Sequence, residues 1–201
     1  MPLLTRCRRI LFSPIAEWQR IGKECSPVRA LLAGYVIPMA LIPAVASFIG
    51  YGFIGVNGLR FRVRGLYWGS AMAIDSFITS LVVYWLGTYI VDWLGIGFGS
   101  KRNAKRAAQL VAYSYTPAWI AGIFFLWPSL HGLIALGLYG VYLFHLGIPV
   151  LKPGQRDQRI SYTIISAILL IVVRFLIGLL IVNIIFSFWG DPYLPFSPAL
   201  F

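Results

Sequence analysis

Long runs of apolar positions, separated by short polar segments, are the dominant pattern of this chain. Each run reaches the about 20 residues that a helix needs to cross the hydrocarbon core of a bilayer. Lipid offers no partner for an unpaired backbone N–H or C=O group, so segments this apolar must be helical. The pattern therefore predicts an all-α polytopic membrane bundle of five transmembrane helices, over roughly residues 30–49, 67–94, 107–126, 130–151 and 162–189.

The composition agrees with a membrane protein and limits what else the chain holds. Hydrophobic residues make up 59% of the 201 residues and charged residues only 11%, whereas a soluble domain is about a quarter charged. Five spans leave no room for a separate soluble domain. We expect a cytoplasmic leader over residues 1–29, the membrane domain over 30–189 and an irregular outer tail over 190–201.

The distribution of charge sets the expected topology and partners. The net charge of +11 is compatible with nucleic-acid binding, but 13 of the 17 Lys and Arg residues fall in the leader and in two loops on the same side of the membrane. The positive-inside rule then places the N-terminus in the cytoplasm and the C-terminus outside. We expect membrane lipids with anionic headgroups as partners at the cytoplasmic face, and no nucleic acid.

The leader predicts an amphipathic helix lying at the membrane interface. Ser13 is a suitable N-cap, Pro14 fits the first helical position and Glu17 falls in the first turn. An interfacial helix needs an apolar face with cationic edges, and here the apolar face is formed by Leu11, Ile15, Trp18 and Cys25.

The outer loop between the first two spans changes to a period of two. Asn57-Gly58 is a strong hairpin-turn signal, and we expect strands over residues 53–56 and 59–64. Alternation would place Arg60, Arg62 and Arg64 on one face. The hairpin is either a cationic flap that contacts anions or a solvated loop resting on the bundle.

Prolines interrupt the first and third spans. Proline removes a helical hydrogen bond and leaves a backbone carbonyl without its usual donor. Such breaks can line transport sites, although a kink packed by neighbouring helices is more common. The candidate polar crevice consists of Pro38, Pro43, Tyr113, Ser114, Thr116 and Pro117.

Ionisable residues inside the spans are few and default to a functional hypothesis with a named partner. Asp75 and Arg174 fall at overlapping depths, so we expect them to pair, either as a structural clamp or as a responsive gate. Asp92 and His145 fall near the inner interface and form a second candidate pair. His131 and His145 lie too far apart on one helix to bind the same metal ion.

The sequence contains none of the catalytic motifs H-E-x-x-H, G-x-S-x-G or the P-loop. We therefore expect no enzymatic activity, no cofactor and no metal site.

An ordered set of motifs resembles the Ypt-interacting protein (Yip) domain in its bacterial inner-membrane branch. The set comprises residues 11–18, the Pro-interrupted first span, residues 112–117, residues 138–142 and residues 146–149. The resemblance implies five spans with a cytoplasmic N-terminus and a bacterial inner-membrane location. It also implies, for eukaryotic members, a link to Rab-type GTPases through a longer N-terminal region.

Two functions are compatible with these features. The first is a non-enzymatic protein that organises or remodels the membrane through lipid contacts or a membrane partner, including a second copy of itself. The alternative is a lipid scramblase or small-solute transporter whose path lies near the kinked first and third spans.

Overall fold

The computed structural model describes residues 3–24, 26–57, 62–154 and 156–189, which are almost entirely helical. Two short N-terminal helices precede the bundle, and one two-residue strand pair interrupts it. The elements are α1 (Leu3–Phe12), α2 (Pro14–Lys23), α3 (Val28–Leu31), η1 (Leu32–Val36), α4 (Ile37–Ile49), η2 (Gly50–Ile54), β1 (Val56–Asn57), β2 (Arg62–Val63), α5 (Leu66–Gly97), α6 (Ala104–Ser114), α7 (Thr116–Ala121), η3 (Gly122–Leu126), η4 (Pro128–Leu138), α8 (Tyr139–Leu151), η5 (Arg156–Gln158) and α9 (Arg159–Trp189).

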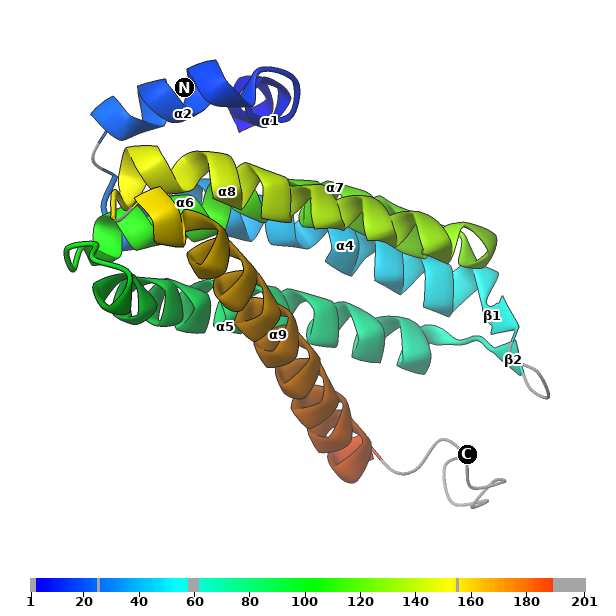
Figure 1. Ribbon diagram of the computed structural model, residues 1–201. Coiled ribbons are helices and arrows are strands. Elements are labelled where there is room, and N and C mark those ends of the chain that lie inside the picture. Colours follow the sequence, from blue (N-terminus) through cyan, green and yellow to red (C-terminus); the bar gives the residue numbers. More distant parts are fainter. Residues whose placement is uncertain (1–2, 25, 58–61, 155, 190–201) are drawn as a thin grey trace.

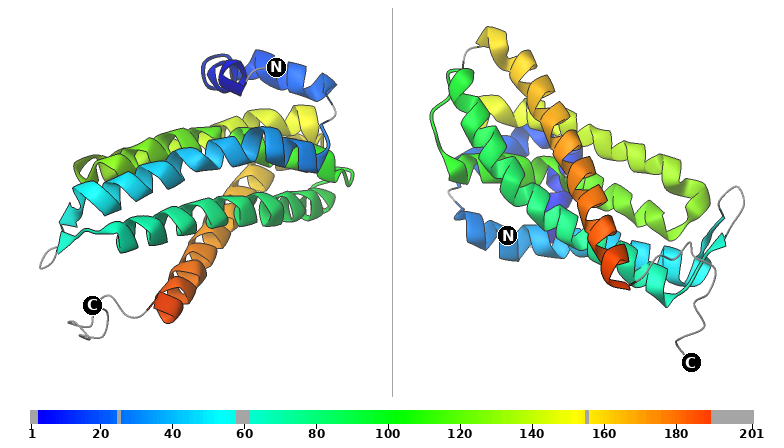
Figure 2. Two further views of the ribbon diagram at one scale, coloured as in Figure 1. Left: turned by 180° about the vertical axis from the view of Figure 1, so that it is seen from behind. Right: turned by 90° about the horizontal axis from the view of Figure 1, so that it is seen from below.

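The long helices lie side by side, with one exception (Figure 1). Helices α4 and α5 run alongside the α6–α7 and η4–α8 segments, and the N-terminal helices lie over α8. Helix α9 crosses α5 at a steep angle and leans away from the other helices toward its C-terminal end (Figure 2). The basic loops between α5 and α6 and between α8 and α9 meet at one end of the bundle, which we call the inner end.

The first predicted span is continuous over Val28–Ile54 although it contains two prolines. A π-helical segment, η1, ends just before Pro38, and Pro43 lies inside α4. A π turn shifts the hydrogen-bond register by one residue, which lets the helix continue past a residue that donates no N–H.

The third predicted span is divided. The chain leaves α6 at Tyr115, restarts as α7 with Pro117 in its first turn, and continues as the 3₁₀ segment η3. Four helices in the described part of the chain are therefore long and apolar enough to cross a membrane: Val28–Ile54, Leu66–Gly97, Ser129–Leu151 and Arg159–Ile185. The all-helical membrane fold is confirmed.

The predicted hairpin has a different register from the expected one. Val56 pairs with Val63 and Asn57 with Arg62, whereas a two-residue turn at Asn57-Gly58 would pair Val56 with Leu59. The expected strand over residues 53–56 is also wrong, because the first span continues as η2 to Ile54 and ends at Gly55, whose φ is 82°. Residues 58–61 lie outside the described residues.

The N-terminal segment forms two helices instead of one. Pro14 begins α2 as predicted, but the Ser13 side chain makes no cap hydrogen bond. The predicted apolar face is divided, because Trp18 is buried against the bundle while Ile15 is 62% exposed, and Glu17, which the prediction did not place on that face, is buried. Cys25 lies outside the described residues. The reason is that the buried side of α2 faces α8 and α1, where Glu17 meets an arginine.

Candidate functional site

One cavity of the described chain lies between the proline-interrupted helices and α9. Its volume is about 440 Å³ and it is open on one side. Most of its wall is apolar. The lining comes from α4, α5, α6, α7, η3, η4, α8 and α9 and includes Pro43, Ser76, Ser80, Val111, Ser114, Tyr115, Ala118, Trp119, Phe125, Ile134, Ala135, Gly137, Leu138, Gly140, Val141, Phe144, Ala167, Leu170, Ile171 and Arg174.

Few polar side chains reach this cavity. Ser80 already donates to the carbonyl of Ser76, at 2.7 Å. The Ser114 hydroxyl is buried and has no hydrogen-bond partner in the described structure. Arg174 lies near the middle of the candidate span Arg159–Ile185, and the ion pairs within 4.0 Å in the described chain do not include it. The cavity thus combines an apolar wall with a cation and an unpaired hydroxyl at membrane depth.

Asp75 and Arg174 approach each other across Gly178. A Cβ built on Gly178 would lie 3.8 Å from Arg174 Nη1 and 3.9 Å from Asp75 Oδ1. The Thr79 hydroxyl donates a hydrogen bond to Asp75 Oδ1, at 3.0 Å. The paired hydrogen bonds expected between the carboxylate and the guanidinium are not among the contacts of the described chain, so Arg174 keeps donors for another partner.

The predicted polar crevice is brought together only in part. Pro43 and Ser114 line the cavity, but Pro38, Tyr113, Thr116 and Pro117 do not. The kink at Pro43 is filled from α7 and η3, since a Cβ on Gly122 would collide with the proline ring.

The break in the third segment satisfies its own backbone. Pro117 has no N–H for the carbonyl of Tyr113, and the Thr116 hydroxyl donates to that carbonyl instead, at 2.8 Å. The Tyr35 hydroxyl bonds Thr116 Oγ1 at 2.7 Å. Gly140 then lets α8 pack directly on the carbonyl of Ser114. The break is therefore a packed joint, and Ser114 beside it lines the cavity with its buried hydroxyl unpartnered in the described structure.

A buried ion cluster, which the sequence reading missed, holds the N-terminal helices on the bundle. Arg6 pairs with Glu17 at 2.7 Å and with Glu24 at 2.6 Å. Its guanidinium also lies 5.5 Å from the centre of the Tyr113 ring, which adds a cation–π contact. Trp18 meets the same ring edge-on, at 6.3 Å.

Helix α6 adds contacts to α2 at the inner end, and we call these contacts together with the Arg6 ion cluster the N-terminal clamp. Arg106 donates to the carbonyls of Ile21 and Glu24, and Gln109 donates to the Glu24 carbonyl. The last carbonyls of a helix lack partners within it, so these side chains cap α2. The positive charge of the Arg106 guanidinium also interacts favourably with the negative end of the α2 dipole.

Asp92 does not take His145 as its partner. It accepts from Lys152 Nζ at 2.6 Å and from the Asn103 backbone N–H at 2.7 Å, with Arg102 at 3.9 Å. Asp92 pairs with Lys152 and not with His145 because the end of α8 places the Lys152 ammonium in direct contact with the carboxylate.

His145 bonds the Thr163 hydroxyl at 2.9 Å through Nδ1, and its carbonyl accepts from Arg159. This side of the inner end is thus held by contacts between α8 and α9. Groups of three or more His, Cys, Asp or Glu residues that could hold a metal ion do not occur among the described residues.

The anion contact expected of the outer arginines remains a prediction. Arg60 lies outside the described residues, Arg62 pairs through its backbone with Asn57, and Arg64 is exposed.

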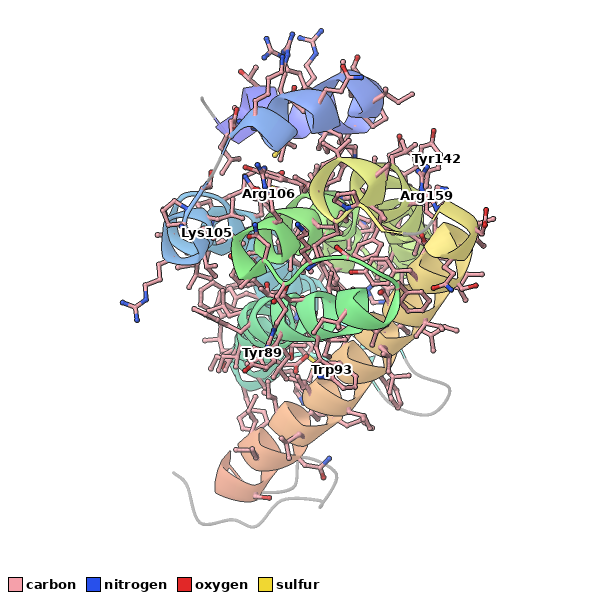
Figure 3. All side chains as sticks on the ribbon, turned by 60° about the vertical axis from the view of Figure 1, so that its left-hand side comes forward. Tyr89, Trp93, Lys105, Arg106, Tyr142 and Arg159 are labelled. Carbon is pink, nitrogen blue, oxygen red and sulfur yellow. The ribbon has the colours of Figure 1, made fainter. Side chains whose placement is uncertain are left out.

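Exposed basic and aromatic side chains gather at the inner end (Figure 3). Lys105 extends from α6, while Tyr89 and Trp93 project from α5. Tyr89 and Trp93 are 71% and 64% exposed. Among residues of the leader and inner loops whose burial is described, the other exposed basic side chains are Arg8, Arg20, Lys23, Arg29, Lys101 and Arg102.

Comparison with known proteins identifies the family. The family described as the Yip1 domain matches residues 8–182. Two relatives, both named inner membrane protein YohC, come from Escherichia coli strain K12 and from E. coli O6:H1 strain CFT073. Each is 29% identical over 191 residues, which cover 91% of this chain and 95% of the relative. No solved structure matches the chain. Because the family match spans most of the sequence and covers three of the four described long apolar helices completely and most of the fourth, the protein belongs to the Yip1 domain family of membrane proteins.

Proposed function

We propose that this protein is a non-enzymatic multi-pass protein of the bacterial inner membrane that organises anionic lipids around its inner end. The location follows from the name of its relatives, inner membrane protein YohC. The observation that carries the function is the grouping of exposed basic side chains with exposed aromatic rings at one end of a membrane bundle.

Both kinds of side chain suit a bilayer surface. A basic residue beside an anionic leaflet contributes about 1 kcal/mol to the attraction, and Trp and Tyr favour the headgroup region. The outward side of the N-terminal helices adds exposed Phe12 and Ile15 next to Arg8 and Arg20. The N-terminal clamp holds this surface in a fixed position.

The proposal includes five spans with a cytoplasmic N-terminus. The divided segment from Ala104 to Leu126 runs alongside α8 over most of its length (Figure 1) and would be the third span. Cysteine labelling of intact cells tests this topology. Asp157→Cys should react only after the inner face is made accessible, whereas Arg64→Cys should react from outside. The reverse pattern would refute the topology.

Energy transfer from the reconstituted protein to a fluorescent phosphatidylglycerol tests the lipid role. In mixed vesicles the anionic probe should be enriched around the protein relative to a phosphatidylcholine probe. A triple change of Arg20, Lys23 and Lys105 to Gln should reduce this enrichment, since it removes about 3 kcal/mol of attraction at about 1 kcal/mol per residue.

The matched control keeps the charge at the same three positions with Arg20→Lys, Lys23→Arg and Lys105→Arg. It should behave like the unaltered protein at low salt. Equal enrichment of both probes in the unaltered protein would contradict the proposed function.

A lipid scramblase is the second candidate, and the observation that favours it is Arg174 in an open cavity at membrane depth. Vesicles with a fluorescent lipid in both leaflets and an external quencher distinguish the two functions. An organiser leaves the inner leaflet fluorescent. Loss of fluorescence from both leaflets, abolished by Asp75→Asn or by Pro38→Ala with Pro117→Ala, would establish the scramblase.

A further inference from the structure

We propose that the cavity between α4, α7, η4 and α9 is a binding site for one membrane phospholipid, with Arg174 and Ser114 holding its phosphate and the apolar wall holding a tail. This inference concerns what the cavity contains. It stands whether the protein organises lipids at its inner end or moves them between leaflets.

The size and chemistry of the cavity fit an amphipathic ligand. Its volume of about 440 Å³ falls within the roughly 300–1,000 Å³ of small-molecule sites, which typically combine an apolar wall with a few polar groups. Apolar side chains such as Val141, Leu170 and Ile171 form most of the wall. A free phosphate ion would leave this wall without a partner, whereas an acyl chain would cover it.

Two polar side chains that line the cavity, Arg174 and Ser114, have no direct acceptor among the contacts of the described residues. Arg174 is absent from the ion pairs of the described chain, and the nearby Asp75 bonds Thr79. The Ser114 hydroxyl is buried and unpartnered. A guanidinium and a hydroxyl can both donate to phosphate oxygens, and arginine matches phosphate geometry with two parallel hydrogen bonds. A phosphate therefore supplies what both groups lack.

The cavity opens toward the side of the bundle that lipid would surround. Leu138 of η4 and Ile171 of α9 line it, yet they are 61% and 53% exposed. Helix α9 leans away from η4 and α8 in this region (Figure 2). A lipid can thus enter sideways from the bilayer, without passing through either end of the bundle.

Photo-crosslinking in vesicles tests the site. Two probes carry the same diazirine-bearing tail: phosphatidylglycerol, which has the phosphate, and diacylglycerol, which lacks it. We expect phosphatidylglycerol to label peptides from η4–α8 and from the middle of α9, about tenfold more than diacylglycerol, because a charge-assisted hydrogen bond of the usual strength corresponds to about that factor. An excess of inorganic phosphate should not reduce this labelling.

Two variants test the contributions of the lipid phosphate and of the acyl chain to labelling separately. Arg174→Gln should reduce labelling by phosphatidylglycerol to the diacylglycerol level, while Arg29→Gln, which removes an exposed charge outside the cavity, should leave it unchanged. Ala167→Phe should fill the cavity and reduce labelling by both probes, whereas Ala30→Phe on an exposed position should not.

The comparison of the two probes needs only the unaltered protein, so it decides the question even if a variant fails to fold. Equal labelling of the cavity by both probes would overturn the role of the phosphate. Absence of cavity labelling, with label confined to the outer surface of the bundle, would overturn the site. Displacement by inorganic phosphate would show that the site binds the free ion and would also overturn the proposal.

Discussion

The buried ion pair between Lys152 and Asp92 makes an asymmetric prediction about stability. Lys152 is 1% exposed, and among the described residues it donates to two acceptors, Asp92 Oδ1 at 2.6 Å and the Lys101 carbonyl at 2.8 Å. Asp92 has further partners in the Asn103 N–H at 2.7 Å and Arg102 at 3.9 Å. Removing the carboxylate therefore strands a charge more completely than removing the ammonium does.

The magnitudes follow from that difference. Asp92→Asn should cost about 3–5 kcal/mol, the usual range for breaking a buried ion pair and leaving one charge behind. Lys152→Met keeps the apolar stem and leaves Asp92 with its other donors, so we expect about 1–3 kcal/mol, the range for one unsatisfied buried group. The double variant should cost less than the sum of the two, by more than about 1 kcal/mol.

The assay is reversible unfolding of the purified protein in mixed micelles with increasing SDS, followed by tryptophan fluorescence. Arg102→Gln serves as the control. Its side chain is 62% exposed, so its loss should cost under about 1 kcal/mol. Additive costs within about 0.5 kcal/mol, or a larger cost for Lys152→Met than for Asp92→Asn, would refute the reasoning.

Three further predictions concern the packed joint and the N-terminal helices. Thr116→Val should cost about 1–3 kcal/mol of unfolding free energy because it removes the buried hydroxyl that donates to the Tyr113 carbonyl and bonds the Tyr35 hydroxyl, and the same SDS titration measures it. Gly147→Val should loosen both α2 and α6 from α8, because a Cβ on Gly147 would lie 2.5 Å from Leu110 Cδ1 and 2.9 Å from the Trp18 ring; faster proteolysis of the N-terminal segment would report the first effect, and a lower unfolding free energy in the SDS titration the second. Burial raises the pKa of the Cys7 thiol, so less thiolate is present at neutral pH. In a chain whose other cysteine is replaced by serine, maleimide labelling should be slow until detergent denaturation, and rapid labelling of the native protein would contradict the buried placement.

The long apolar helices were predictable because membrane length and lipid polarity leave the backbone little choice. The side of the leader that is buried was not, because an isolated helix shows its own polarity but not its docking partner. From the sequence, Glu17 is expected to be a solvent-exposed acid in the first turn of its helix, whereas in the structure it forms a buried ion pair with Arg6. The sequence does contain one usable signal here, since Arg6 and Glu17 each lie on the side of their helix that carries buried apolar residues.

The polar sites show the same limit. Arg174 was identified because an arginine inside a span is rare, but its relation to Ser114 depends on how α6, α7 and α9 cross. The partner of Asp92 was assigned by depth along the helix. That reasoning favoured His145 and overlooked Lys152, which lies just past the end of α8 and turns back toward α5. Ser76 and Ser80 share one helix face by their four-residue spacing, and that spacing could have marked the cavity wall.

The docking of the N-terminal helices has a consequence for the order of assembly. Their sequence leaves the ribosome first, but the surfaces that receive them, Arg106 on α6 and Gly147 on α8, follow more than eighty and more than a hundred residues later. At about 5–20 residues per second the leader waits on the order of ten seconds before its binding surface exists. During that interval its charged and apolar faces can bind the membrane surface. The N-terminal clamp can therefore close only after the third and fourth segments are in place.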